Sequence, residues 1–251
     1  MPSRPRRVYG GAVFFWRRSG DGILTAVTDR AGGVSDGAYA GLNLAAHVGD
    51  DPEAVATNRA LLSAELGIAP ERLVLMDQCH GADVAVVEGR PDVAPAVDAL
   101  VTATPGLALV ALVADCTPIL LADPGAGVVA AVHAGRPGLV AGVVPRAVSA
   151  MRDLGATTVT AVVGPSICPR CYEVPAALRD EVAAVSPESR AVSWTGTPAL
   201  DVAAGVVAQL VGAGVAVEWL PGCARQDARL FSYRRDGATG RYAGLVLREV
   251  R

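Results

Sequence analysis

The sequence predicts a single α+β domain with mixed β-sheets and flanking helices. Short runs rich in Val, Ala and Leu, typical of buried strands, alternate irregularly with stretches that have helical periodicity. The 251 residues fit one large domain, and a hydrophobic content of 51% is ample for a core without disulfides. Because no repeat or low-complexity linker divides the chain, we expect residues 1–251 to form one domain.

Four helices are predicted from capping residues and periodicity. Asp51-Pro52 begins the first helix, which carries its apolar residues on one face. Apolar positions between 140 and 154 predict a second helix, in which Pro145 either causes a kink or marks the true first turn. Pro175 begins another helix, and Thr197-Pro198 begins the last.

Buried strands are predicted where apolar residues run without alternation. In chain order these runs are residues 22–28, 73–76, 99–102, 107–114, 128–132, 159–163 and 215–219. Asp123-Pro124-Gly125 is a turn signal, so we expect the preceding apolar run to return through a hairpin to Val128. The segment 125–130 also fits GxGxxA, but it precedes a strand and we interpret it as this turn, not as a dinucleotide-binding loop.

The charged residues exclude several functions. The formal net charge is -3 and the positive residues are scattered, so we expect no nucleic-acid partner. All 22 positive residues are arginine. Without lysine the chain cannot form a Schiff base, anchor pyridoxal phosphate or build a P-loop of the GKS or GKT kind.

The remaining composition predicts a cytoplasmic protein. No long apolar segment follows the basic N-terminal MPSRPRRVYGG, and the longest apolar run is 107–114, so neither a signal peptide nor a membrane span is expected. Five cysteines, an odd number, argue against a disulfide scaffold and favour a reducing compartment.

Three residues that can bind a metal follow predicted strands. His80 lies in LVLMDQCHG, Cys116 ends LALVALVADC and His133 lies in VVAAVHAG. Clefts in sheet proteins form where strands end, so these side chains are candidates to meet. Two imidazoles and a thiolate suit Zn²⁺, which keeps a fourth position for water in catalytic sites. Spacing alone equally allows each residue to cap its strand, and no local motif such as HExxH supports a metal.

Three other motifs have weaker functional interpretations. Residues 33–37, GVSDG, match the nucleophile elbow GxSxG, but no convincing helix follows, which argues against a serine hydrolase. Cys168-Pro169-Arg170-Cys171 is a CxxC that could be a redox pair or half of a zinc ribbon. No second CxxC exists, so a ribbon is not expected, and the loop is interpreted as one wall of the site. His47 is interpreted as a hydrogen-bonding loop residue.

Taken together, eight segments resemble the family named for multicopper polyphenol oxidase, or laccase-domain proteins. The match runs from about residue 28 to residue 243. The family is also described as purine nucleoside phosphorylases with adenosine deaminase activity and as peptidoglycan-editing factors. The segments are TDRAGGVSDGAYAGLNLAAHVGDD, NRALL, QCHGADV, DALVTATPG, ADCTPILL, VHAGRPGLVAG, GPSICPRCYEV and LFSYRRDGATGRYAG.

The resemblance implies a fold and a metal site. The fold would be an αββα-like sandwich, and one Zn²⁺ per chain would be held by His80, Cys116 and His133. The chain departs from the family pattern where HAGRPG replaces HAGWRG, which removes a tryptophan and moves the arginine to Arg136. Cys168 stands where the family has glycine, and Cys79 is an unusual neighbour for a zinc ligand.

The resemblance also implies a zinc-dependent purine nucleoside phosphorylase with adenosine deaminase activity, acting on adenosine, inosine and related nucleosides. We expect phosphate or water to attack the bound nucleoside, with Cys116 and His133 at the centre and Asp115 or Asp98 relaying the proton. Arginines are expected to grip phosphate through paired donors, and polar amides to orient the nucleoside. The candidate substrate-binding residues are Arg30, Asn43, Arg59, Gln78 and Arg136.

Other functions are chemically possible. Cys116 as nucleophile and His133 as base would make an amidase acting on a peptidoglycan precursor. A non-catalytic zinc protein would need a fourth protein ligand, and no further His or Cys is placed to provide it. Three histidines are too few for an oxidase with several copper ions. We expect a monomer whose partners are a purine nucleoside and phosphate.

Overall fold

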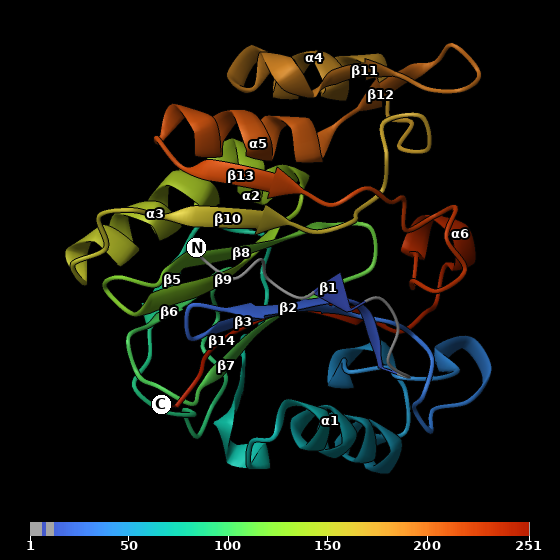
Figure 1. Cartoon of the computed structure of the whole chain (residues 1–251). Coiled ribbons are helices and arrows are strands. Elements are labelled where there is room, and N and C mark those ends of the chain that lie inside the picture. Colours follow the sequence, from blue (N-terminus) through green and yellow to red (C-terminus); the bar gives the residue numbers. More distant parts are fainter. Residues whose placement is uncertain (1–6, 9–12, 251) are drawn as a thin grey trace.

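Two six-stranded sheets pack face to face, and helices cover their outer faces (Figure 1). The computed structural model describes residues 7–8 and 13–250. This arrangement confirms the predicted mixed α+β fold with an αββα-like layering. Most of the basic N-terminal segment lies outside the described residues. Within the described part, no helix is long and apolar enough to cross a membrane.

The first sheet has the order β1-β2-β3-β14-β7-β4. Its pairs are antiparallel except β4 with β7, which is parallel. The C-terminal strand therefore lies in the middle of the sheet. The strands are β1 (Arg7–Val8), β2 (Phe14–Gly20), β3 (Ile23–Thr28), β4 (Leu73–Leu75), β7 (Ala108–Val113) and β14 (Tyr242–Arg248).

The second sheet has the order β13-β10-β8-β9-β6-β5, with parallel pairs at its two edges and antiparallel pairs between them. A separate hairpin joins β11 to β12. The strands are β5 (Val84–Val86), β6 (Ala99–Thr102), β8 (Thr117–Asp123), β9 (Val128–Ala134), β10 (Thr160–Val163), β11 (Arg190–Val192), β12 (Pro198–Leu200) and β13 (Ala216–Trp219).

Helices lie outside the two sheets, with α1 on the first and α2, α3 and α5 on the second (Figure 1). The α-helices are α1 (Pro52–Leu66), α2 (Arg136–Ala141), α3 (Val143–Asp153), α4 (Ala176–Val185), α5 (Val202–Gly212) and α6 (Tyr233–Asp236). Short 3-10 helices are η1 (Gly37–Tyr39), η2 (Ala46–Val48), η3 (Pro70–Arg72) and η4 (Pro187–Ser189).

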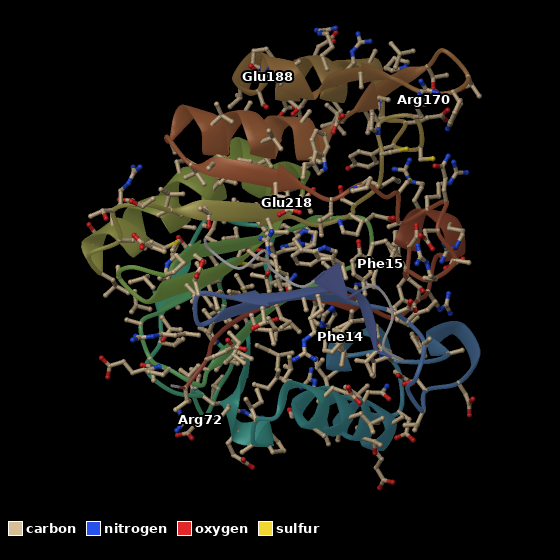
Figure 2. The ribbon with its side chains drawn as sticks, in the orientation of Figure 1. Phe14, Phe15, Arg72, Arg170, Glu188 and Glu218 are labelled. Carbon is tan, nitrogen blue, oxygen red and sulfur yellow. The ribbon has the colours of Figure 1, made fainter. Side chains whose placement is uncertain are left out.

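Three apolar clusters hold these layers together: one between the sheets, one under α2, α3 and α5, and one under α1. Consecutive residues of β2 show the division, because Phe14 packs in the α1 cluster and Phe15 against the cluster between the sheets (Figure 2). The strands at the centre are buried on both faces, which explains why their sequences are continuously apolar and not alternating.

Several element boundaries follow the predicted local signals. The Asp51 carboxylate accepts a hydrogen bond from the Glu53 N–H at the start of α1, and Gly67 ends the helix at a φ of 68°. Pro175 is the N-cap of α4, as predicted. The turn at 123–128 connects β8 to β9 in an antiparallel hairpin, which confirms the interpretation of GxGxxA as a turn.

Other boundaries differ from the prediction. The second predicted helix is two helices, because Gly142 takes a left-handed φ of 82° between α2 and α3, and Pro145 falls in the first turn of α3. The helix predicted to begin at Thr197-Pro198 begins at Val202 instead. Pro198 starts the short strand β12, a position that suits proline as well as a helix start does.

Several strands were not predicted, among them β2 and β14 of the first sheet. β2 carries two arginines, and β14 contains Gly244, so neither resembles a continuous apolar run. The glycine has a packing reason: a Cβ at this position would lie 2.6 Å from the Pro118 Cβ on the facing sheet.

Candidate metal centre and substrate cavity

The fold brings His80, Cys116 and His133 together at one edge of the two sheets. His80 lies in the loop after β4, which is the parallel neighbour of β7. Cys116 lies where the chain leaves β7 and enters β8 in the facing sheet. His133 lies inside β9, opposite Pro118 of β8. The sequence prediction that all three follow strands is therefore right for His80 and Cys116 but not for His133, which precedes the last residue of its strand.

The ligand atoms of these three residues all lie within 4.8 Å of one another. The Cys116 Sγ is 3.8 Å from the His80 Nε2, and the two imidazole rings stand nearly perpendicular, with centroids 4.8 Å apart. Tetrahedral zinc, at about 2.0–2.3 Å from each ligand, holds ligand atoms roughly 3.5 Å apart. The spacing and the donor set of two imidazoles and one thiolate therefore fit zinc.

The backbone is adapted to this convergence at two non-glycine residues. His80 has a φ of 59° and Asp115 a φ of 95°, in the region that side chains rarely occupy. Gly135 leaves the space that the ligands use, because a Cβ there would lie 2.7 Å from the His80 Cδ2 and 3.2 Å from the Cys116 Sγ. A larger residue at position 135 would push into the group of ligands.

Asp98 holds two of the candidate ligands in position through hydrogen bonds to His133 and to the backbone at His80 and Gly81. It is fully buried, and its Oδ1 lies 2.8 Å from the His133 Nδ1. The same carboxylate accepts hydrogen bonds from the backbone N–H of His80 and of Gly81 and from the Cys79 thiol. Because Nδ1 of His133 is engaged, its Nε2 faces the other two ligands, the arrangement found behind metal-binding histidines.

These contacts shift the acid–base equilibria of the metal-free protein. Burial alone would raise the pKa of Cys116, but the facing His133 and hydrogen bonds from His133 and His80 lower it to about 6. Burial alone would lower the pKa of His133, but Cys116 and the bond to Asp98 raise it to about 9. Burial alone would raise the pKa of Asp98, but hydrogen bonds from His133 and Cys79 lower it to about 2. The pair Cys116 and His133 therefore favours thiolate and imidazolium at neutral pH.

A cavity of about 430 Å³ opens over the centre. This volume lies within the range of small-molecule pockets, about 300–1,000 Å³. Its lining combines the metal-binding group with apolar, aromatic and cationic side chains. The residues are His47, Gln78, His80, Leu112, Val113, Ala114, Asp115, Cys116, His133, Gly135, Arg136, Ile167, Tyr172, Val202, Tyr233, Arg234 and Arg241.

Two of the five predicted substrate-binding residues line this cavity. Arg136, the first residue of α2, does so beside the metal centre. Gln78 also lines it, but its amide already donates to the Leu112 carbonyl and accepts from the Leu112 N–H. Asp115 lines the cavity as well, and its carboxylate accepts from the Ser232 hydroxyl and the Arg234 N–H. Burial raises the pKa of Asp115.

The structure does not bring the other three to the cavity. The Arg30 guanidinium lies 4.5 Å from the centroid of the Phe231 ring and donates to the Ala40 carbonyl. The Arg59 Nε donates to the Leu44 carbonyl. Asn43 is buried, and its Oδ1 accepts from the backbone N–H of Arg241. Their hydrogen-bonding groups are engaged by backbone atoms of other segments.

Several lining residues were not singled out from the sequence. Arg234 and Arg241 come from the C-terminal segment, and Tyr172 from the loop after β10. Arg234 lies over the Tyr172 ring, 5.0 Å from its centroid, and together with Arg136 these arginines make one side of the cavity cationic. The only signal in the sequence is that these residues belong to two segments that resemble the family, GPSICPRCYEV and LFSYRRDGATGRYAG. His47, interpreted as a loop residue, also lines the cavity.

The weaker motifs are placed elsewhere. Ser35 of GVSDG is buried and its hydroxyl bonds to Asp50, so it is not an exposed nucleophile. Cys168 and Cys171 of the CxxC lie beside the cavity wall, next to Ile167 and Tyr172. The loop therefore contributes to a wall, as its sequence position indicated.

Comparison with known proteins identifies the family. The model described as "Multi-copper polyphenol oxidoreductase laccase" matches residues 24–249. A purine nucleoside phosphorylase of Streptomyces coelicolor is 57% identical over 233 residues, covering 90% of this chain and 96% of the relative. One of Mycobacterium tuberculosis is 49% identical over 231 residues, covering 90% and 92%.

Solved structures share the fold. The crystal structure of YlmD from Geobacillus stearothermophilus has a TM-score of 0.88 and 31% identity, covering 98% of this chain and 100% of that one. The family match, the relatives and the two-sheet fold agree. The chain belongs to the family described as multi-copper polyphenol oxidoreductase laccase, whose similar members include proteins named purine nucleoside phosphorylase.

Proposed function

We propose that the chain is a zinc-dependent purine nucleoside phosphorylase that also deaminates adenosine. The observation that carries this proposal is one cavity lined both by the group His80, Cys116 and His133 and by the cationic residues Arg136 and Arg234. The names of the relatives support the nucleoside and phosphate substrates. Arginine binds phosphate through paired charge-assisted hydrogen bonds.

The side chains of the cavity have separable roles in this proposal. Arg136, Arg234 and Arg241 bind the phosphate, and Tyr172 offers an aromatic face to the purine. Asp98 holds the orientation of His133 through its 2.8 Å contact. Zinc at the centre would supply Lewis-acid activation of an external nucleophile.

In phosphorolysis a phosphate oxygen forms a bond to C1′ of the ribose, and the glycosidic C–N bond breaks. The leaving purine takes up a proton, so the products are the free base and ribose 1-phosphate. Asp115 is the proposed proton donor, because its half-buried carboxyl lines the cavity and desolvation raises its pKa. In deamination water attacks C6 of adenine and ammonia leaves, giving inosine.

The two activities are tested by varying the nucleophile. With adenosine and phosphate, the zinc-loaded protein should produce adenine and ribose 1-phosphate, and with adenosine in buffer without phosphate it should produce inosine. Product chromatography distinguishes these outcomes, and His133→Ala should abolish both. Copper in place of zinc by elemental analysis, with no product from adenosine in either buffer, would refute the proposal.

An amidase is the alternative function, and one observation favours it. Cysteine hydrolases combine a nucleophile, a base and a carboxylate that orients the base, and these roles could be filled by Cys116, His133 and Asp98. The pKa of Cys116 is lowered to about 6, which favours the thiolate. An amidase would form an acyl-enzyme at Cys116 and leave nucleosides unchanged. Zinc at the centre would instead protect Cys116 from alkylation until a chelator removes the metal.

We also propose a monomeric cytoplasmic enzyme. All five cysteines of the chain are free in the structure, in agreement with a reducing compartment. A multicopper oxidase is disfavoured by the composition, because the sequence has three histidines and His47 lies outside the group of metal ligands.

A further inference from the structure

A second group of three cysteines lies outside the centre already described. The Sγ atoms of Cys168, Cys171 and Cys223 all lie within 4.8 Å of one another. The backbone N–H of Cys168 donates to the Cys223 Sγ at 3.3 Å, and a turn bond from the Cys171 N–H to the Cys168 carbonyl closes the CxxC. A third cysteine therefore lies beside the CxxC, although Cys223 follows Cys171 by 52 residues in the chain.

The sheet topology explains why these segments meet. β10 and β13 are parallel neighbours, so the loops that leave their carboxyl ends start side by side. An isolated parallel bridge joins Ser166 to Cys223, and the Ala224 N–H donates to the Ser166 carbonyl. The two loops are fixed to each other immediately beside the three sulfur atoms.

The three thiols lie in a small cluster of mainly apolar side chains. Cys171 and Cys223 are buried, Cys168 is half-buried, and Ile167 and Tyr172 pack against them. Arg170 lies between the two cysteines of the CxxC, and its guanidinium, labelled in Figure 2, is 4.3 Å from the centroid of the Trp194 ring of the β11–β12 hairpin. Three thiols that face one another in such a setting are a set of soft ligands.

Soft thiolates select thiophilic cations such as Zn²⁺ and Cu⁺. We propose that Cys168, Cys171 and Cys223 bind one such cation as a second metal site. On binding, three thiols release three protons to solvent and form three metal–sulfur bonds. A disulfide would use two of the sulfurs and leave the third without a role, whereas a metal ion uses all three.

The second ion has a structural consequence for the cavity. Ile167 and Tyr172 flank Cys168 and Cys171 and line the cavity, and the Ile167 N–H donates to the Asp115 carbonyl. The ion would fasten the loop after β10 to the loop after β13 and thereby hold this wall in place. The second site shares no residue with the group His80, Cys116 and His133, and it does not depend on the nucleoside reaction.

The test counts metal ions per chain in the full-length protein. The reduced, chelator-treated protein is titrated separately with Zn²⁺ and with Cu⁺ under anaerobic conditions, and Co²⁺ serves as a spectroscopic probe of thiolate binding. The wild type should bind two ions per chain. Cys171→Ser and Cys116→Ser should each bind one, and the sulfur-to-cobalt absorption should fall more for the first variant, which loses a ligand from the three-thiolate site.

A second variant is needed as a control, because substitution of the buried Cys171 could itself cause misfolding. Cys168→Ala changes the half-buried thiol, and circular dichroism checks that both variants are folded. A wild type that binds one ion, or a count that Cys171→Ser and Cys168→Ala leave at two, would overturn the second site. A Cys168–Cys171 disulfide found by peptide mapping of the protein purified under reducing conditions would overturn it as well. Cys116→Ser should lose nucleoside turnover and still bind an ion at the second site. The proposed function and the second site can therefore fail independently of each other.

Discussion

At the scale of residues, the centre depends on small and charged groups that are not themselves ligands. Asp98 bonds to His133 and also to the backbone around His80, so one carboxylate fixes two ligands that are distant in the chain. Gly135 leaves the space beside His80 and Cys116. Mutation of residues that support metal ligands typically weakens metal binding about 10–100-fold.

Gly135→Ala tests the space beside the ligands. The backbone at Gly135 is extended, with φ −82° and ψ 173°, so alanine fits the conformation and the protein should remain folded. The new methyl group would press on His80 and Cys116, and we expect zinc binding to weaken about 10–100-fold. Competition with a chromogenic chelator measures this. Gly89→Ala is the control, because no atom lies within 4 Å of its added Cβ, and equal affinities in the two variants would contradict the geometry.

Substitutions of Arg136 and Arg30 provide a second test. The sequence predicts that both arginines bind phosphate, but only Arg136 lies at the cavity. Arg136 lines the cavity, whereas Arg30 is engaged by Phe231 and Ala40. Arg136→Ala should raise the KM for phosphate roughly tenfold or more, the size of a lost hydrogen bond to a charged group, while Arg30→Ala should leave it nearly unchanged. Steady-state kinetics with phosphate varied decides between them, and the reverse order would restore Arg30 as the phosphate ligand.

At the scale of elements, the ends of strands are held by buried polar groups. Asp123, the last residue of β8, is buried and accepts hydrogen bonds from the backbone N–H of Ala126, Thr157 and Thr158. It thereby joins the β8–β9 turn to the segment before β10. Burial opposes ionisation of this carboxyl, but the bonds from Thr158, Ala126 and Thr157 outweigh it and lower its pKa.

Asp123→Asn should therefore destabilise the protein in a pH-dependent way. The folded pKa lies below the unfolded value, so the carboxylate stabilises the fold fully above about pH 4 and loses its contribution as the pH falls through the folded pKa. Near pH 7 we expect a loss of about 1.5–3 kcal/mol in the free energy of unfolding by urea. The exposed Asp92→Asn is the control. A difference between wild type and Asp123→Asn that stays constant down to pH 3 would contradict this role.

At the scale of the whole molecule, the apolar clusters and the candidate metal ligands lie in different places. The three apolar clusters lie between the sheets and under the helices, whereas the ligands lie at one edge. Metal-free protein should therefore keep its circular dichroism spectrum and melt at a lower temperature than zinc-loaded protein. Binding to the folded state alone adds about 4 kcal/mol at a thousandfold excess over the dissociation constant. A chelator-treated chain that is unfolded at 25 °C would show that the fold needs its metal.

Local interactions made several features predictable from the sequence. A cap such as Asp51 or Gly67 acts within one turn of its helix, and a strand buried on both faces is continuously apolar whatever its partner. His80 and Cys116 stood out because rare, metal-binding residue types follow such strands. Strands with a mixed composition, such as β2 and β14, carried no such signal.

Contacts between distant residues could be found only in the folded chain. The bond from Asp98 to His133 spans 35 positions, and the contact of Cys168 with Cys223 spans 55. The choice of Arg136 over Arg30 as a cavity residue likewise depends on which loop reaches the edge of the sheets. Strand pairing sets these distances, and it brings together residues whose spacing along the chain contains no information about their separation in space. The residue types of the candidate metal centre were thus readable from the sequence, whereas the hydrogen bonds of Asp98 to it, its cavity and the three-cysteine group came from tertiary packing.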